Sequence, residues 1–229
     1  MKKVGVVVFP GSNCDYDVYH VVKKLLNLRA EYIWHKDTAI RDYDAIVLPG
    51  GFSFGDNLRA GAIARFSPVM QEIIKHAENG KPLIGICNGF QVLVESGLLP
   101  GALITNTGLR FKCEDTYLKV ENDNTIFTKD YKKGQVVKMP IAHYTGNYFA
   151  KNDVIKDLED NNQIVFKYCD ADGNVSEEAN PNGSIKNIAG IMNKGKNVLG
   201  MMPHPERACE TLLGSDEGLA VFTSMLGGN

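Results

Sequence analysis

One cysteine lies in a sequence context that could support covalent catalysis. Cys87 is flanked by Gly85 and Gly89, directly after an apolar run at 82–86 that predicts a buried strand, and a helical segment follows. A nucleophile between two glycines at a strand-to-helix turn is typical of a nucleophile elbow, in which strained backbone exposes the reactive atom. The start of the helix behind Cys87 would favour a thiolate. The alternative is a structural cysteine beside a glycine turn, and the short pattern alone does not separate the two.

A histidine near the C-terminal end could serve that thiolate. A thiolate that attacks an amide needs a base to take its proton and to return one to the leaving nitrogen. His204 lies between two prolines that fix the backbone on both sides of the imidazole. Glu206 could accept a hydrogen bond from the second ring nitrogen, as the third member of a catalytic triad does. The alternative is a rigid loop with an incidental His-Glu pair, and His143 is the rival base.

A glycine pair after the apolar run 45–48 could supply the third chemical element. Gly50 and Gly51 can expose backbone N–H groups with no side chain in the way. One of these donors, together with the N–H of Asn88, would make an oxyanion hole. An ordinary tight turn is the alternative. Neither GxGxxG nor GxxxxGK[ST] occurs in the chain, so the sequence does not predict a phosphate loop.

The first half of the chain alternates strand-like and helix-like segments. Short apolar runs that end in turn residues suit buried parallel strands, and they occur at 3–9, 45–48 and 82–86. A helix over about 18–28 has its cap candidates at Ser12 and Asn13. A second helix starts at Ser67-Pro68 and ends at Asn79-Gly80. This alternation predicts a doubly wound parallel sheet.

The second half of the chain no longer alternates strands with long helices. Residues 101–150 show strand-like alternation and turn residues, as at 117–121. The later segments are a short helix at 153–160, strands at 164–169, 188–192 and 198–202, and a closing helix from Ser215 to Leu226. Without an internal repeat or a linker, the sequence predicts one domain over 1–229, with an antiparallel extension of the sheet.

The composition limits the function. Among 229 residues, 25 Lys and Arg stand against 27 Asp and Glu, a net charge of −2 with no excess of cations to meet phosphates. We therefore expect neither a nucleic-acid nor a membrane partner. Pro10-Gly11 cuts the apolar run 4–9 too short for a signal-peptide core or a membrane span. Five widely spaced cysteines without a CxxC pair argue against a disulfide framework and against a metal site, so we expect a reducing cytoplasm.

Several motifs, taken in order along the chain, resemble those of a known family. Residues 49–51 (PGG), 85–91 (GICNGFQ) and 204–206 (HPE) resemble the class I glutamine amidotransferases. Further stretches narrow the resemblance to the glutaminase subunits of phosphoribosylformylglycinamidine synthases. These stretches are 9–15 (FPGSNCD), 51–56 (GFSFGD), 58–64 (LRAGAIA), 140–143 (PIAH) and 201–207 (MMPHPER). They run from the first strand towards the last helix and cover nearly the whole chain.

The resemblance implies a fold and a set of site residues. The fold is α/β and class I glutamine amidotransferase-like (flavodoxin-like), with a doubly wound, mostly parallel sheet and an antiparallel extension. The implied residues are the nucleophile Cys87, the base His204, the orienting acid Glu206, the backbone oxyanion donors Gly51 and Asn88, and the substrate-binding Gln91 and His143, with no metal ligand. Relatives often carry His-Gly-Glu-Gly where this chain has 143–146 (HYTG), so the contacts of that segment are open.

The resemblance also implies an activity. The chain would hydrolyse L-glutamine to glutamate and ammonia through a thioester on Cys87. The ammonia would serve the ATP-dependent conversion of formylglycinamide ribonucleotide to formylglycinamidine ribonucleotide in purine biosynthesis. A large synthetase subunit and a small third subunit would be the protein partners. No cofactor is expected in this chain, because ATP and Mg²⁺ would belong to the synthetase.

Three other functions fit the same motifs. One is a class I glutaminase that serves another synthetase. A second is a cysteine hydrolase of the related intracellular-protease type, although those proteins usually carry His directly after the nucleophile, where this chain has Asn88. The third is a non-enzymatic interaction module on the same fold.

Overall fold

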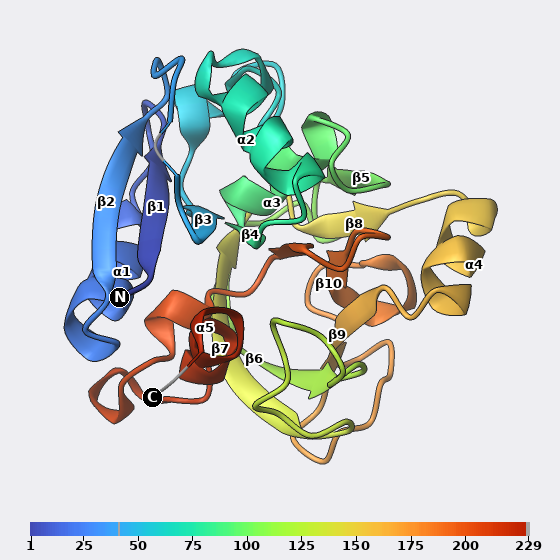
Figure 1. The fold of residues 1–229 in the computed structure, drawn as a ribbon. Coiled ribbons are helices and arrows are strands. Elements are labelled where there is room, and N and C mark those ends of the chain that lie inside the picture. The colour runs from blue at the N-terminus through green and yellow to red at the C-terminus, as the bar shows by residue number, and fades with distance from the viewer. Residues whose placement is uncertain (41, 228–229) are drawn as a thin grey trace.

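The computed structural model describes residues 1–40 and 42–227, and a mixed sheet dominates it. The strands are β1 (Lys3–Val8), β2 (Arg29–Trp34), β3 (Ala45–Leu48), β4 (Leu83–Ile86), β5 (Ala102–Ile104), β6 (Lys112–Val120), β7 (Val136–His143), β8 (Asn147–Phe149), β9 (Ile164–Cys169), β10 (Ile188–Met192) and β11 (Val198–Met201). Among the described residues, nine of them form one sheet in the order β2-β1-β3-β4-β11-β10-β9-β6-β7, and β5 pairs with β8 separately (Figure 1).

One half of the sheet is parallel. β1 pairs in parallel with β2 and β3, β3 with β4, and β4 with β11. Every residue of β3 and β4 is buried, as expected for strands with helices over both faces. The doubly wound parallel sheet that the sequence predicts is therefore confirmed.

The other half is antiparallel. β11 pairs with β10, β10 with β9, β9 with β6, and β6 with β7 in antiparallel register. Along β7, buried and half-buried residues alternate, because successive side chains of a strand point to opposite faces. The predicted antiparallel extension is confirmed, and it contributes as many strand pairings as the parallel half.

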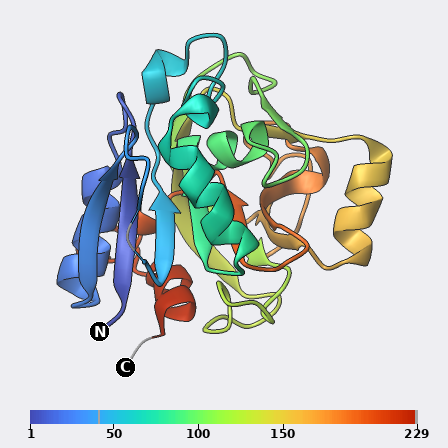
Figure 2. The same cartoon turned by 45° about the horizontal axis from the view of Figure 1, so that its top comes forward.

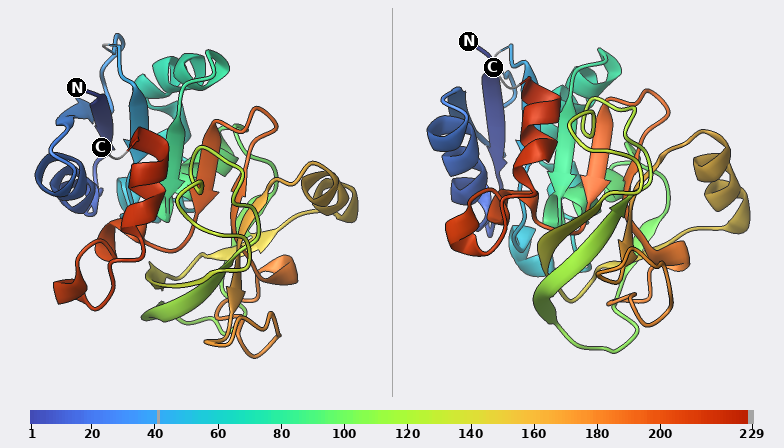
Figure 3. Two further views of the ribbon diagram at one scale, coloured as in Figure 1. Left: turned by 60° about the horizontal axis from the view of Figure 1, so that its bottom comes forward. Right: turned by 90° about the horizontal axis from the view of Figure 1, so that it is seen from below.

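Helices cover both faces of the parallel strands. The α-helices are α1 (Asp15–His20), α2 (Val69–Glu78), α3 (Asn88–Glu95), α4 (Asn152–Asp160) and α5 (Leu219–Leu226). A π-helical turn, Val21–Leu25, continues α1, and short 3₁₀ segments lie at Ser53–Asp56, Ala64–Phe66, Ile185–Asn187, Pro205–Arg207 and Thr211–Leu213. α2 lies over the parallel strands in Figure 2, whereas α1 and α5 lie on the opposite face in Figure 3. α4 stands apart, beside the antiparallel half.

The first helix begins later than the sequence predicts. The predicted caps at Ser12 and Asn13 are wrong, because α1 begins at Asp15. The Ser12 hydroxyl instead accepts a hydrogen bond of 3.0 Å from the N–H of Phe9. This bond closes the turn after β1, so the Ser12 oxygen is not free to cap a helix.

The last helix also begins later. Its predicted start at Ser215 is wrong, because α5 begins at Leu219. Ser215 forms an isolated β-bridge with Glu210, and its hydroxyl accepts a bond of 3.2 Å from the N–H of Glu217. The residues before Leu219 are therefore held in a turn. The second helix ends at Asn79-Gly80 as predicted.

The order of the parallel strands decides which loops meet. β1, β3, β4 and β11 lie side by side and run in one direction, so their carboxyl ends share one edge of the sheet. The loops that leave this edge begin at 9, 49, 87 and 202. In open α/β sheets, ligands bind in the crevice outside such carboxyl ends. That the whole of 1–229 is one domain remains a prediction.

Candidate active site

Cys87 lies in a strained turn between β4 and α3. Its backbone has φ 50° and ψ −105°, a conformation that L-residues rarely adopt. A side chain at Gly85 would meet the backbone of Gly89 at 2.6 Å, and one at Gly89 would collide with the carbonyl oxygen of Leu48. Only glycine fits at these two positions, which is the packing that a nucleophile elbow requires. The glycine pattern predicted from the sequence therefore has a steric cause.

The turn holds the sulfur of Cys87 against β7 and β11. The N–H of Cys87 donates to the carbonyl of Met201, the last residue of β11, over 2.8 Å. Its Sγ lies 3.6 Å from the carbonyl oxygen of Ala142. The side chain is 4% exposed, so a reactant would have to enter the crevice to reach it.

His204 and Glu206 form a buried pair just after β11. His204 Nδ1 lies 2.6 Å from Glu206 Oε1, and the two residues are 1% and 2% exposed. The N–H of His204 donates to the carbonyl of Pro140 over 2.9 Å, which fixes the backbone. His204 Nε2 and Glu206 Oε2 have no hydrogen-bond partner among the described residues. The free Nε2 is the atom that a general base would use.

The surroundings of His204 favour its protonated form. Burial by itself lowers the pKa of the imidazole. Burial is the largest single effect, but the Glu206 carboxylate and the thiols of Cys87 and Cys14 together outweigh it, so the pKa of His204 lies well above its ordinary value. A group that holds a proton beside a thiol can stabilise the thiolate and later act as an acid.

The N–H groups of Gly51 and Asn88 have no hydrogen-bond acceptor among the described residues. Gly51 has φ 145°, and a side chain there would meet Gly11 and Asn13 at 2.8 Å. Hydrogen bonds from Asn13 N to Gly50 O (3.4 Å) and from Phe52 N to Gly11 O (2.9 Å) fix the turn. These bonds leave out the N–H of Gly51. The N–H of Asn88 lies in the first turn of α3, where no intrahelical acceptor exists.

The Gln91 side chain is bonded to protein at both ends. Its Nε2 donates to the carbonyl of Thr145 over 2.6 Å, and its Oε1 accepts from Asn88 Nδ2 over 2.9 Å. Asn88 Oδ1 in turn accepts from the N–H of Ser53 over 3.1 Å. Gln91 therefore ties the elbow to the turn after β7. Sequence reasoning assigned it to the substrate, and the substrate-binding role stays a prediction.

His143 is a buried, neutral imidazole. Within the part of the chain that the structure describes, neither ring nitrogen has a hydrogen-bond partner, and the residue is 2% exposed. Burial, with a contribution from nearby His204, lowers its pKa to about 3. Asn106 donates to its carbonyl over 3.0 Å and accepts from the N–H of Gly146 over 3.0 Å. A ring with so low a pKa is a weaker candidate for the base than His204.

Sequence reasoning gave no role to a second thiol in this site. Cys14 follows β1, and its Sγ, a ring nitrogen of His204 and a carboxylate oxygen of Glu206 all lie within 4.8 Å of one another. Arg207 Nη2 donates to Cys14 Sγ over 3.0 Å. Burial first, and then the Glu206 carboxylate, raise the pKa of the Cys14 thiol. Its place in the loop between β1 and α1, at the edge where the carboxyl ends of the parallel strands meet, is the signal that could have found it.

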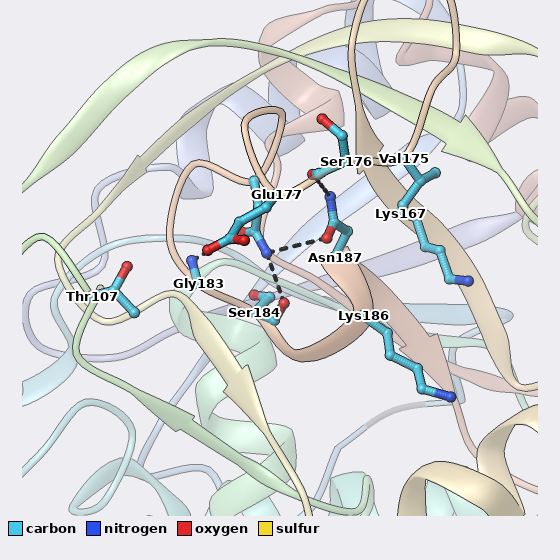
Figure 4. Close-up of a pocket in the computed structure, with 10 residues that line it drawn as sticks. Thr107, Lys167, Val175, Ser176, Glu177, Gly183, Ser184, Lys186 and Asn187 are labelled. Atoms are coloured by element: carbon cyan, nitrogen blue, oxygen red, sulfur yellow. Dashed lines mark hydrogen bonds between the residues drawn. The ribbon is translucent and has the colours of Figure 1, made fainter.

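Two cavities bear on the choice of site. One of about 170 Å³ adjoins the His204 pair. Its lining residues are Asn13, Cys14, Gly51, Phe52, Phe111, Ala142, His204 and Arg207. The other, of about 700 Å³, contains none of the residues predicted for catalysis (Figure 4). Polar groups there bond one another, as Asn187 Nδ2 does with the carbonyl of Ser176 at 2.6 Å. Choosing the larger cavity as the active site would therefore miss the residues predicted for catalysis.

No helix within 1–40 and 42–227 combines the length and the apolar composition that a membrane crossing requires.

Comparisons with known proteins agree with this geometry. A family model described as a CobB/CobQ-like glutamine amidotransferase domain matches residues 1–217. The chain is 57% identical to the phosphoribosylformylglycinamidine synthase subunit PurQ of Chlorobium luteolum over 222 residues, 97% of this chain and 96% of that protein. It is 53% identical to the PurQ subunit of Salinibacter ruber over 224 residues, 98% of this chain and 95% of that one. A chain in the structure of PurLQS from Thermotoga maritima superposes with a TM-score of 0.87 at 44% identity, covering 99% of this chain and 98% of that chain.

Proposed function

The chain belongs to the family of CobB/CobQ-like glutamine amidotransferase domains, and from this premise we propose that it is the glutaminase subunit of a phosphoribosylformylglycinamidine synthase. It hydrolyses L-glutamine to glutamate and ammonia. The ammonia serves the ATP-dependent conversion of formylglycinamide ribonucleotide to formylglycinamidine ribonucleotide in purine biosynthesis. The observation that carries the proposal is the strained Cys87 beside the buried His204–Glu206 pair, in a chain that is 57% identical to a PurQ subunit over nearly its full length.

The chemistry proceeds in two halves. The Cys87 thiolate attacks the side-chain amide carbon of glutamine, and the carbonyl becomes an oxyanion that the N–H groups of Gly51 and Asn88 can receive. His204 then gives its proton to the departing nitrogen, the C–N bond breaks, and ammonia leaves a thioester behind. Water attacks the thioester while His204 takes its proton, and cleavage of the C–S bond releases glutamate and the thiolate.

The supporting groups act without touching the reacting carbon. The 2.6 Å contact between Glu206 and Nδ1 of His204 holds the ring in one tautomer and stabilises the imidazolium. Loss of one oxyanion donor of the kind offered by Gly51 typically raises a barrier by about 2.7–4 kcal/mol. Gln91 and His143 are the residues proposed to bind the substrate, and the ring nitrogens of His143 have no hydrogen-bond partner among the described residues.

The protein partners are inferred from membership of the same family. The Thermotoga maritima relative is part of a PurLQS structure, so we assign to this chain a large synthetase subunit and a small third subunit. ATP and Mg²⁺ belong to the synthetase in this proposal, and this chain carries no cofactor. A cytoplasmic location fits a catalytic thiol that must stay reduced.

A glutamine-analogue alkylator tests the assignment of the nucleophile. We expect it to label Cys87 and to spare the other four thiols, as located by peptide mass spectrometry. Burial raises the pKa of Cys14, Cys169 and Cys209, so these thiols stay protonated. Cys113 is exposed and serves as the internal control for non-specific alkylation. Labelling mainly at other cysteines would contradict the assignment of Cys87 as the nucleophile.

A coupled assay tests the physiological partner. Glutaminase activity is measured on this chain alone and with its synthetase and formylglycinamide ribonucleotide. Productive coupling to this synthetase is the expected result. Coupling to a different synthetase, but not to this one, would instead make the chain a glutaminase of another pathway.

A further inference from the structure

Three metal-binding atom types converge beside the proposed base. The Sγ of Cys14, a ring nitrogen of His204 and a carboxylate oxygen of Glu206 lie within 4.8 Å of one another, and all three residues are buried. Cys14 comes from the loop after β1, and the other two from the loop after β11. The cluster therefore exists only because these strands lie in one sheet with their carboxyl ends at the same edge.

One carboxylate oxygen of the cluster lacks a hydrogen-bond partner among the described residues. The ring nitrogen on the side of Glu206 is Nδ1, which lies 2.6 Å from Oε1, whereas Nε2 serves the reaction proposed above. Glu206 Oε2 makes no hydrogen bond among the described residues, and Glu206 is 2% exposed. Buried polar atoms are nearly always bonded, so an unpartnered oxygen in this place points to a ligand that completes the site.

We propose that Cys14, His204 and Glu206 bind a thiophilic divalent cation of the Zn²⁺ class, and that this cation blocks the reaction. Zn²⁺ takes thiolate, imidazole and carboxylate ligands, and with three protein ligands it keeps an open position for water. Metal–ligand distances of about 2.0–2.3 Å place neighbouring ligand atoms about 3.4 Å apart. His204 Nδ1 and Glu206 Oε1, now hydrogen-bonded at 2.6 Å, separate to that spacing when the metal enters, and the Sγ of Cys14, within 4.8 Å of both residues, reaches it through side-chain rotation.

The cation and catalysis exclude each other. Binding releases the proton of the Cys14 thiol and any proton on the ligating nitrogen of His204. With a metal on Nδ1, Nε2 keeps the remaining ring proton, so His204 cannot act as the base that takes a proton from Cys87 or from water. This inhibitory consequence rests on the proposed function, whereas the binding itself does not.

Arg207 affects how tightly the site binds a cation. Its Nη2 lies 3.0 Å from Cys14 Sγ, and its Nε lies 3.3 Å from Asp17 Oδ2. The guanidinium stabilises a thiolate, but it also places a positive charge beside an incoming cation. The two effects oppose each other, so the site suits reversible occupancy that follows the free metal concentration rather than a permanently bound ion.

Metal binding is measured first, in a variant that cannot catalyse. The full chain with Cys87→Ser keeps all three proposed ligands, so it should bind one Zn²⁺, and Co²⁺ should give a thiolate-to-cobalt charge-transfer band. Adding Cys14→Ser should remove the band and weaken Zn²⁺ binding at least about 100-fold, more than loss of an outer-shell partner costs. Adding Cys113→Ser instead, at an exposed thiol, should change neither. A melting curve of each variant verifies folding, and Cys14→Ala replaces Cys14→Ser if the latter unfolds.

Inhibition is measured second, on the complete complex. Zn²⁺ should inhibit glutamine hydrolysis and slow the alkylation of Cys87. The inhibitory concentration should rise at least about 100-fold with Cys14→Ser and stay unchanged with Cys113→Ser. Tight binding that survives the loss of Cys14 would overturn the proposal, as would absence of binding to Cys87→Ser. The binding assay needs no turnover. Its result can therefore be interpreted even if the chain proves not to be a glutaminase.

Discussion

His204 Nδ1 and Glu206 Oε1 lie 2.6 Å apart, and both residues are almost completely buried. A contact this short between an imidazole and a carboxylate is a charge-assisted hydrogen bond. It commits one ring nitrogen to Glu206 and leaves Nε2 as the only ring atom that can exchange a proton with Cys87 or with the leaving ammonia. The orientation of the base is therefore set before glutamine binds.

Glu206→Gln should lower kcat for glutamine hydrolysis by about 10²–10⁴-fold with little change in KM. The amide keeps the size of the side chain but cannot stabilise an imidazolium, and it can enforce the wrong tautomer. The measurement is kcat and KM from steady-state kinetics on the complete complex. Glu210→Gln is the matched control, because Glu210 pairs with His20 at 2.9 Å on a half-exposed surface. Equal kinetics of the two variants would remove Glu206 from the mechanism.

Gly89→Ala should destabilise the protein by about 3 kcal/mol or more, at the upper end of overpacking effects. The new methyl group would collide with the carbonyl oxygen of Leu48, a backbone atom that cannot move without disturbing β3. Gly108→Ala is the control, since no atom lies within 4 Å of the position of its Cβ, and a change within about 0.5 kcal/mol is expected. Urea unfolding of both variants is the measurement. A Gly89→Ala variant as stable as the control would show that the elbow has room to relax.

Much of this site could be predicted from local sequence. The Cys87 elbow, the glycine turn before Gly51 and the His204–Glu206 pair each depend on residues near one another in the chain. Cys14 could not be assigned in that way, because its proximity to His204 depends on the order of β1, β3, β4 and β11. Sequence periodicity predicts that such strands exist but does not fix their neighbours.

The same limit applies to Gln91. Sequence places it one helical turn beyond Cys87, on the substrate side. Its acceptor, the carbonyl of Thr145, lies 54 residues further along the chain. A hydrogen bond to backbone leaves no signature in the identity of the residue that supplies the carbonyl. The departure from the relatives' pattern at Tyr144-Thr145 therefore does not disturb the contact with Gln91.

Gln91→Leu should lower kcat for glutamine hydrolysis on the order of 10- to 100-fold. The substitution leaves the Thr145 carbonyl without this partner and Asn88 Nδ2 with only its long 3.5 Å contact to Asp56, at about 1–3 kcal/mol for a buried group that loses its bond. The elbow that carries the N–H of Asn88 would lose its tie to the turn after β7. Thr145→Glu is the matched control, since Gln91 Nε2 bonds the backbone carbonyl of Thr145, which the substitution keeps, and near-normal rates are expected. A rise in KM alone for Gln91→Leu would place its amide on the substrate instead.

A strained turn beside the elbow carries a carboxyl group whose pKa lies above its ordinary range. Phe54, Gly55, Asp56 and Leu58 all have positive φ. Burial raises the pKa of Asp56 to about 6. Its closest polar contact, from Asn88 Nδ2, is long at 3.5 Å. The charged form of Asp56 is therefore poorly compensated.

Asp56→Asn should stabilise the protein above pH 6 and have little effect near pH 4. The folded pKa of about 6 lies above the unfolded value of about 3.9, so the folded state binds the proton more tightly, and this contribution to stability is lost as pH rises through 6. A shift of this size corresponds to at most about 3 kcal/mol. Because the side chain is only half-buried, solvent screening reduces the expected gain to about 1 kcal/mol. Melting temperatures of wild type, Asp56→Asn and the exposed control Asp172→Asn, measured from pH 4 to pH 7.5, test this. If the Asp56→Asn gain were the same at every pH, it would come from packing or backbone strain, and the carboxylate would not be the cause.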